Sequence, residues 1–198
     1  VALSCGDQTA LRMGRVTLNP VRHIDPFGTV LLPLMLMLFH APFLFGYAKP
    51  VPVNFNALRN PRLDSMWVAL AGPGANFLLA LTSGLLLHTL VLFSGAWHTL
   101  FKDMFEFSLV FNCLIGLFNL IPILPLDGGR VVASLLPEPL RSWWSSTERF
   151  GLLLVLTLIF LLPWALGSIG IQFSPIQYIL KNLVFYVQNG ILYLTGHI

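Results

Sequence analysis

Residues 66–93 form an apolar run that contains no Asp, Glu, Lys or Arg and is interrupted only by Gly72-Pro73-Gly74 and Asn76. As a helix that rises about 1.5 Å per residue, this run is long enough to cross a hydrocarbon core of about 30 Å. The whole composition agrees, because 56% of the 198 residues are hydrophobic, 10% are charged and the mean hydropathy is +0.80. The sequence therefore predicts an all-α polytopic membrane protein, organised as one membrane-embedded domain over residues 1–198.

Two further apolar runs, residues 105–126 and 150–171, predict transmembrane spans. Trp164 lies near the end of the second run, where interfacial aromatic residues are typical. Residues 94–104 predict a short loop before the first of them. The tail, residues 176–194, predicts either a last span with its polar stripe turned inward or a helix that lies in the interface. These alternatives arise because three polar residues fall within about 40° on a helical wheel at 100° per residue: Gln177, Lys181 and Gln188.

Residues 1–28 and 47–65 are polar and rich in turn signals, so we expect them outside the hydrocarbon. Prolines alternate with other residues in Lys49-Pro50-Val51-Pro52-Val53, which holds this segment extended. The sequence therefore predicts a small extended or β subdomain beside the helices.

Positive charge indicates the topology. Lys and Arg number three in residues 47–65, one in 94–104 and three in 127–149, so the first and last of these loops are predicted to be cytoplasmic. Residues 1–28 also carry three, which implies that 29–46, interrupted by prolines, enters the membrane and returns. The basic residues lie in polar loops and form no run, so the net charge of +3 argues against a nucleic-acid partner and is better interpreted as topology information. Membrane lipid is the expected partner of the apolar spans.

Cys5 and Cys113 are far apart and match no metal or redox spacing, which predicts that both are unpaired. The chain begins at Val1 without a signal-peptide pattern, and we interpret it as an internal or N-terminally truncated segment.

The stretch from Phe118 to Arg130 runs an apolar segment into a carboxylate, Asp127. Pro122 and Pro125 disrupt a helix there because they lack backbone donors, and Gly128 and Gly129 let the backbone bring the carboxylate close to another helix. A charge at the end of a membrane segment is costly and is by default a functional-site hypothesis. Asp127 could bind a metal ion, or it could cap the helix that begins at Gly128.

Other polar groups in the apolar part of the chain have two interpretations each. Asn119 could form an interhelical hydrogen bond or donate to a developing oxyanion. The small residues from Ala71 to Asn76 predict close helix packing and a scaffold role. No two histidines have the i, i+4 spacing that binds zinc on a helix, and only His23 lies near enough to other polar groups to line a site.

Six ordered blocks of the sequence then carry a family resemblance. They are Gly6-Asp7-x-Thr9-Ala10, Gly14-Arg15-x-Thr17-Leu18-Asn19-Pro20, His23-Ile24-Asp25-Pro26-x-Gly28-Thr29, Ala48-Lys49-Pro50-Val51-Pro52-Val53-Asn54, Ala71-Gly72-Pro73-x-Ala75-Asn76 and Asn119-Leu120-Ile121-Pro122-x-x-Pro125-Leu126-Asp127-Gly128-Gly129-Arg130. In these blocks the chain resembles the short, bacterial-type branch of the site-2 protease family of intramembrane zinc metalloproteases. The resemblance covers residues 1 to about 135.

The resemblance implies an enzyme of a bacterial inner membrane that cleaves a transmembrane protein near the cytoplasmic side, using water activated by zinc. Asp127 then corresponds to the aspartate ligand of zinc, and Asn119 to an asparagine that helps bind the substrate carbonyl. The family's two histidine ligands and its general-base glutamate come from a His-Glu-x-x-His helix, which the 198 residues do not contain. We therefore expect this chain by itself to be inactive and the complete protein to be a protease.

Two hypotheses remain beside this interpretation. The extended segment could receive an unwound substrate strand by edge pairing at Val51 and Val53. The alternative to an enzyme is a catalytically dead relative that binds membrane partners, or a small transport component with Asp127 on an ion path.

Overall fold

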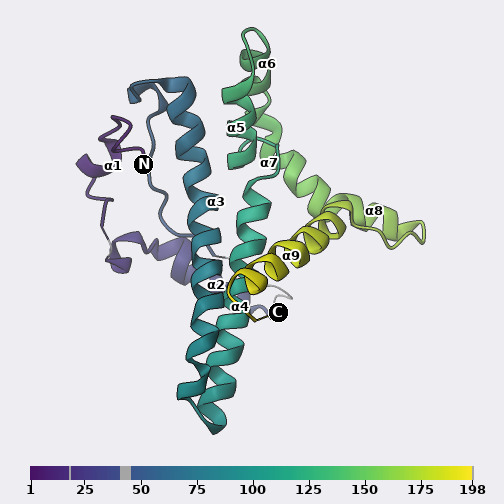
Figure 1. Ribbon diagram of the computed structural model, residues 1–198. Helices are drawn as coiled ribbons and strands as arrows, with labels where there is room; N and C mark the ends of the chain where they lie inside the picture. The colour runs from purple at the N-terminus through teal and green to yellow at the C-terminus, as the bar shows by residue number, and fades with distance from the viewer. Residues whose placement is uncertain (18, 41–45, 198) are drawn as a thin grey trace. The chain divides into compact units, whose positions relative to one another are not determined.

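The computed structural model describes residues 1–17, 19–40 and 46–197 (Figure 1). It divides the chain into two compact units, Val1–Asp64 and Ser65–Ile198. Throughout the described residues the regular structure is helical and no strand occurs. The predicted all-α class is therefore confirmed, whereas the predicted β subdomain is wrong. Residues 46–54 are non-helical but form no ladder, and Pro50 and Pro52 supply no backbone donors for one.

The first unit consists of short helices separated by turns. They are α1 (Thr9–Arg12), η1 (Pro20–His23), η2 (Pro26–Leu31), α2 (Leu32–Leu38) and η3 (Phe55–Ala57). Asn19, Asp25 and Asn54 each precede one of these helices and accept hydrogen bonds from its first amides. This local capping explains why such short helices form, because side-chain oxygens satisfy donors that the helix itself leaves unpaired.

The helical part of the predicted re-entrant segment is short. Helices η2 and α2 together cover Pro26–Leu38, and 13 residues at about 1.5 Å each span roughly 20 Å, less than a core of about 30 Å. The later part of residues 29–46 includes 41–45, which lie outside the described residues. The re-entrant path therefore stays a prediction.

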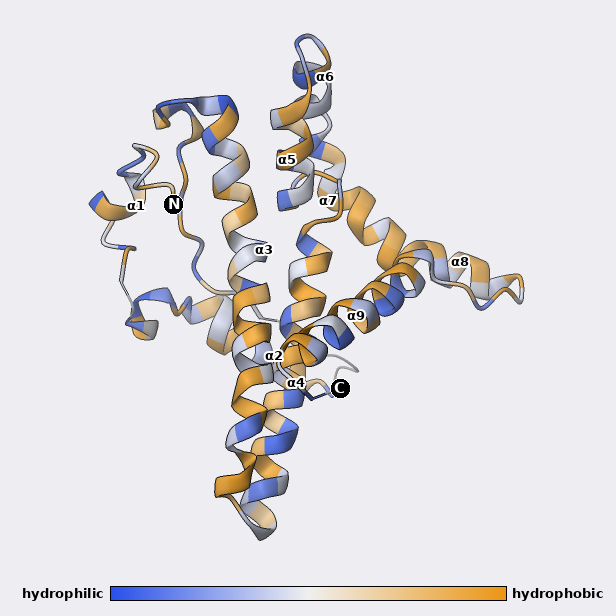
Figure 2. Cartoon of the chain, viewed as in Figure 1, coloured by the Kyte–Doolittle hydropathy of each residue, from blue (hydrophilic) through white to orange (hydrophobic). Residues whose placement is uncertain are grey.

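Two helices in the described residues are long and apolar enough to cross a membrane by length and composition. The first is Pro61–Leu92, which joins α3 (Pro61–Leu86) to η4 (Leu87–Leu92) and continues through Pro73. The second is Glu148–Ser168, which joins α7 (Glu148–Leu156), η5 (Thr157–Leu161) and α8 (Leu162–Ser168). Apolar residues run along both helices (Figure 2). The predicted spans 66–93 and 150–171 largely overlap these two helices, and their crossing of a membrane stays a prediction.

Helix α4 (Gly95–Asn119) is longer than the predicted span 105–126 at its start and ends before it. The predicted loop at residues 94–104 is wrong, because the helix begins at Gly95. The helix begins before the apolar run and includes Lys102, a good helix former that pairs with Glu106 one turn later at 3.8 Å.

Helices α3, α4 and α9 (Pro175–Leu194) form the core of the second unit, where α3 and α4 run side by side (Figure 1). The Ser83 hydroxyl on α3 donates to the Ser108 hydroxyl on α4 at 2.8 Å. Close packing of α3 and α4 uses Gly116, where a Cβ would lie 3.1 Å from the Phe77 ring. The scaffold role of the small residues from Ala71 to Asn76 stays a prediction. The buried core residues come from all three helices: Ala80, Leu109, Cys113, Val184 and Ile191.

Helix α9 packs an apolar face against α3 and α4, on which Leu180, Val184 and Ile191 are buried. Of the predicted polar stripe, Gln177 and Lys181 are exposed, whereas Gln188 is half-buried and borders a cavity beside α4. The inward orientation of the stripe therefore stays a prediction. Whether α9 crosses the membrane or lies in the interface stays a prediction.

The predicted polar segment 127–149 contains two short helices, α5 (Asp127–Leu135) and α6 (Leu140–Ser146), and the start of α7. These helices follow α4 directly and position the site described next. Elsewhere, Cys5 and Cys113 are both free thiols, as predicted.

Candidate metal centre

The site is built on the break between α4 and α5. Helix α4 ends at Asn119, and the chain turns through residues 120–126 before α5 begins at Asp127. Pro122 and Pro125 cannot donate to a preceding helical turn, so the helix stops here. Backbone amides after the end of α4 form tight turns instead. The Ile121 amide donates to the Phe118 carbonyl, and the Leu126 amide donates to the Ile123 carbonyl.

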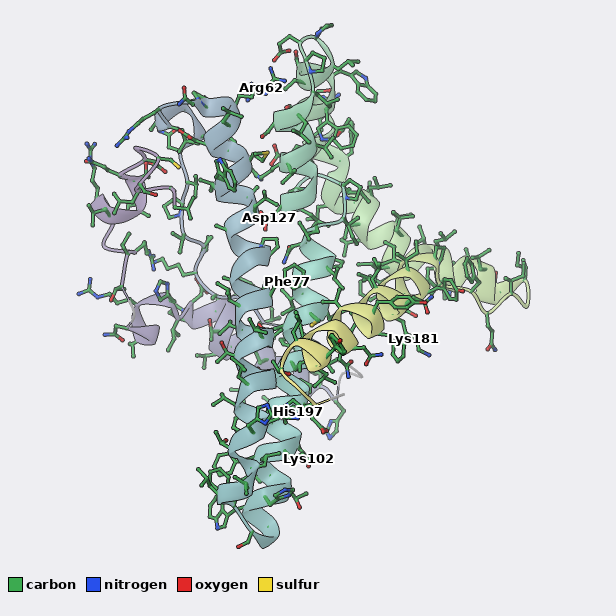
Figure 3. The ribbon with its side chains drawn as sticks, in the orientation of Figure 1. Arg62, Phe77, Lys102, Asp127, Lys181 and His197 are labelled. Atoms are coloured by element: carbon green, nitrogen blue, oxygen red, sulfur yellow. The ribbon has the colours of Figure 1, made fainter. Side chains whose placement is uncertain are left out.

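Asp127 occupies the first turn of α5 and points toward α3 (Figure 3). A Cβ atom built at Gly72 of α3 would lie 3.1 Å from the Asp127 Oδ2 atom. The carboxylate therefore lies directly against the backbone of α3, in space that exists because residue 72 has no side chain.

No helix cap explains this carboxylate. The residue before α5, Leu126, makes no capping bond, and Asp127 has neither a hydrogen bond nor an ion pair with any described residue. Burial raises the pKa of the Asp127 carboxyl above its ordinary value, and the positive charge of Arg130 opposes this only partly. A partly buried carboxylate oxygen without a hydrogen bond or ion pair in the described residues is a group that a metal cation would stabilise.

Gly128 and Gly129 make the break compact. Both are buried, and a Cβ at Gly128 would lie 2.2 Å from the Leu120 carbonyl oxygen. A Cβ at Gly129 would lie 2.4 Å from the Leu124 amide nitrogen. Their role in the structure is to let α5 start against the backbone of the preceding turn, whereas Pro122 is exposed and acts by ending α4.

Asn119 lies at the last position of α4. Its side-chain nitrogen donates to the Ile115 carbonyl of the same helix at 3.1 Å, so it forms an intrahelical bond and not the interhelical bond considered above. Asn119 and Asp127 share no hydrogen bond in the described structure. A role for Asn119 in binding a substrate carbonyl stays a prediction.

Val51 and Val53 belong to the first unit. Their segment is attached at both ends, where the Lys49 amide donates to the His23 carbonyl at 2.9 Å and the Asn54 amide donates to Asp7 Oδ2 at 2.8 Å. In the described residues the backbone amides of Val51 and Val53 have no hydrogen-bond partner.

His23 contributes its ring to the same unit. The imidazole Nε2 is 3.1 Å from the Thr17 carbonyl oxygen, and the ring belongs to no group of metal-ligating side chains in the described residues. Its predicted role in lining a site stays a prediction.

Asp7 is a polar residue whose role the sequence did not indicate. It is only 1% exposed and accepts bonds from the amide and hydroxyl of Thr9 as well as from the Asn54 amide. These bonds lower the pKa of Asp7, the hydroxyl of Thr9 most strongly. The Asp-x-Thr spacing was its local signal, but the bond to Asn54 joins residues 47 apart.

The fold also pairs two histidines that are distant in sequence. The rings of His88 and His197 stack with centroids 4.2 Å apart. Each Nε2 atom meets a backbone carbonyl, that of Thr195 for His88 at 2.6 Å and that of Gly84 for His197 at 2.9 Å. Figure 3 labels His197. The pair joins the α3–η4 helix to the residues that follow α9, and it has no third metal-ligating neighbour in the described chain.

The described residues supply one ligand of a metal site and not a complete site. Across the described residues, no three His, Cys, Asp or Glu side chains come together as a metal would require. A catalytic zinc takes about three protein ligands. Asp127 can supply one of them.

Comparison with known proteins identifies the family. The model of Peptidase family M50 matches residues 90–162, which include α4, the break and α5. A relative from Bacillus subtilis (strain 168), named "Putative zinc metalloprotease YwhC", is 37% identical over 172 residues, which are 85% of this chain and 74% of the relative. A relative from Mycolicibacterium smegmatis (strain ATCC 700084 / mc(2)155), named "Putative zinc metalloprotease Rip2", is 29% identical over 155 residues, 78% of this chain and 57% of the relative.

The site thus lies in a chain of the metallopeptidase class. The chain belongs to Peptidase family M50, the site-2 protease family, as its sequence blocks predicted. No solved structure matches it significantly.

Proposed function

We propose that the complete protein is a zinc-dependent protease that cleaves a transmembrane substrate, and that Asp127 is one of its zinc ligands. The observation that carries the proposal is the unpartnered, partly buried Asp127 carboxylate lying against Gly72, within the residues that the family model matches. The names of both relatives support zinc as the metal.

The remaining zinc ligands and the general base belong, in this proposal, to a His-Glu-x-x-His helix outside these 198 residues. The support is that no three His, Cys, Asp or Glu side chains come together in the described residues, so Asp127 needs further ligands to bind zinc. The printed chain by itself is then expected to bind zinc weakly and to cleave no peptide.

We place the protein in a bacterial inner membrane with its site near the cytoplasmic side. The distribution of Lys and Arg supports this orientation, and the two long apolar helices support the membrane location. A membrane-spanning substrate helix must unwind before its peptide bonds can be attacked, because its backbone groups are paired internally.

The unwound substrate is proposed to pair with Val51 and Val53. Their free amides lie between two anchored ends, which supports this role. Replacing both valines with proline would remove the two donors. Unchanged cleavage of the substrate by that double variant of the complete protein would end this part of the proposal.

Metal analysis of the complete protein tests the ligand assignment. We expect Asp127→Asn to lower the zinc content and to abolish cleavage of a reporter transmembrane substrate, because an amide is a poor substitute for a charged ligand. Asp103→Asn is the matched control, since Asp103 is exposed on α4. Full zinc content in Asp127→Asn would refute the assignment.

The complete reading frame separates an enzyme from the alternatives. A His-Glu-x-x-His sequence in it supports a protease. Its absence would instead favour a catalytically dead binding relative or a transport component, in which the unpartnered Asp127 would have another ligand.

A further inference from the structure

Helix α5, which begins at Asp127, is too short to fix its own orientation. It has nine residues, and the preceding Leu126 provides no side-chain cap. Short helices depend on tertiary contacts for their stability and orientation. The direction of the Asp127 carboxylate is therefore set by whatever contacts the first turn of α5.

Helices α6 and α7 supply those contacts. The indole N–H of Trp144 on α6 donates to the Gly129 carbonyl at 2.9 Å, two residues after Asp127. Three residues before Asp127, the backbone of α7 meets the break, since a Cβ at Gly151 would lie 1.6 Å from the Leu124 carbonyl oxygen. The chain is therefore held by α6 just after Asp127, at Gly129, and by α7 just before it, at Leu124.

The ring of Trp144 also borders a cavity of about 270 Å³ at this contact. The cavity is lined by Pro122, Ile123 and Leu124 of the break and by Trp144, Phe150 and Gly151 of α6 and α7. The backbones of α7 and the break touch at Gly151 and Leu124, but the cavity beside them leaves Trp144 incompletely packed. The indole hydrogen bond is therefore a directional link between α6 and the start of α5.

A second polar link between α5 and α7 is more exposed to solvent. Arg130 and Glu148 form an ion pair at 2.9 Å, but their side chains are 29% and 46% exposed. Solvent and salt screen such a pair, whereas the half-buried indole of Trp144 is less accessible.

We propose that Trp144 is a positioning residue for Asp127, which acts through the Gly129 carbonyl to hold the carboxylate against Gly72. The consequence for zinc rests on the proposed function, but the positioning itself does not. Partners beyond the metal ligands commonly tune metal sites in this way.

A metal-independent experiment tests the positioning. The complete protein carries Cys5→Ala and Cys113→Ala, together with Gly72→Cys and Asp127→Cys, and disulfide formation is timed in membranes. A Cβ at Gly72 would lie 4.0 Å from the Asp127 Cγ atom, so the two thiols can meet. Trp144→Phe keeps an aromatic ring but removes the N–H, and we expect it to slow the cross-link.

Two controls separate positioning from general damage. Trp143→Phe changes a neighbouring indole that is 65% exposed, and it is expected to leave the rate unchanged. A second pair, Ser83→Cys with Ser108→Cys, reports the α3–α4 contact and is expected to form equally fast with and without Trp144→Phe. Equal Gly72–Asp127 cross-linking rates in Trp144→Phe and Trp143→Phe would overturn the proposal.

Zinc affinity of the complete protein with Asp127 intact is the second readout. We expect Trp144→Phe to weaken it by about 10- to 100-fold and Trp143→Phe to leave it unchanged. If the wild-type protein bound no zinc while Trp144→Phe still slowed the cross-link, the proposed function would fail and the positioning role would stand. Equal zinc affinity in both variants would overturn the effect of Trp144 on the metal.

Discussion

Gly72 and Gly74 offer a matched pair of substitutions in one helix. Both glycines lie inside α3, two residues apart. A methyl group at Gly72 would lie 3.1 Å from Asp127 Oδ2, whereas one at Gly74 would have no neighbour within 4 Å. We predict that Gly72→Ala weakens zinc binding by the complete protein and that Gly74→Ala does not.

The expected magnitude follows from the contact distance. Carbon and its neighbours pack best at about 3.5–4.0 Å, so a methyl group at Gly72 would push the carboxylate oxygen by a few tenths of an ångström. Zinc–oxygen bonds are about 2.0–2.2 Å long and tolerate deviations of about 0.2 Å. The shift exceeds this tolerance slightly, which suggests a loss of about tenfold in affinity, or about 1.4 kcal/mol.

The free energy of unfolding should not fall together with the zinc affinity. Alanine is favoured over glycine in a helix interior by up to about 1 kcal/mol, and this gain applies to both variants. Gly72→Ala is therefore expected to unfold no more easily than the wild-type protein while it binds zinc less tightly. That combination distinguishes a displaced ligand from a damaged fold.

The assay is competition between the protein and a zinc chelator of known affinity in detergent, with thermal unfolding of the metal-free protein measured in parallel. Equal zinc affinity in Gly72→Ala and Gly74→Ala would refute the idea that Gly72 makes room for the ligand. A fall in affinity for both variants would show that α3 responds to any added methyl group, which would also contradict the reasoning.

Three other predictions concern stability. Gly128→Ala should cost about 1–3 kcal/mol in thermal unfolding, because its methyl group would lie 2.2 Å from the Leu120 carbonyl oxygen, whereas Gly190→Ala on α9 has open space and should cost nothing; equal melting temperatures would contradict this. The pKa of Asp7 lies below its ordinary value, so its contribution to the first unit is present at neutral pH and is lost as pH falls below about 4. Hydrogen exchange of the Asn54 amide should report this loss, and Asp7→Asn should remove the pH dependence; an unchanged profile in that variant would exclude Asp7 as the cause. Glu148→Gln should cost only about 0–1 kcal/mol because its ion pair with Arg130 is solvent-exposed, and a larger loss that salt does not reduce would argue against screening.

The approximate positions of the long helices could be predicted from apolar runs alone. The charge-free run that starts at residue 66 implied a spanning helix, since hydrocarbon leaves a backbone no partners except its own. The boundary of α4 could not be predicted in this way. Hydropathy marks where the apolar run begins, but the helix starts earlier, at Gly95, and includes the charged residue Lys102, a good helix former.

The extended segment shows a second limit of local reasoning. Alternating prolines correctly excluded a helix around Val51 and Val53, and the structure has none there. A strand needs a paired neighbour as well as an extended backbone, and the described residues provide no ladder partner. Which distant groups anchor such a segment, as Asp7 anchors Asn54, depends on the folded chain.

The sequence by itself determined that Asp127 follows a proline break at the end of an apolar run, because chain order and backbone chemistry are local properties. Only the tertiary structure decided where its carboxylate points. The small residues around Gly72 predicted that something would pack closely there, but not that it would be an acidic oxygen from a residue 55 positions later. Helix faces meet through the packing of the whole unit, so the neighbour of Gly72 and the contact between Trp144 and Gly129 appear only when α3, α5 and α6 are placed together.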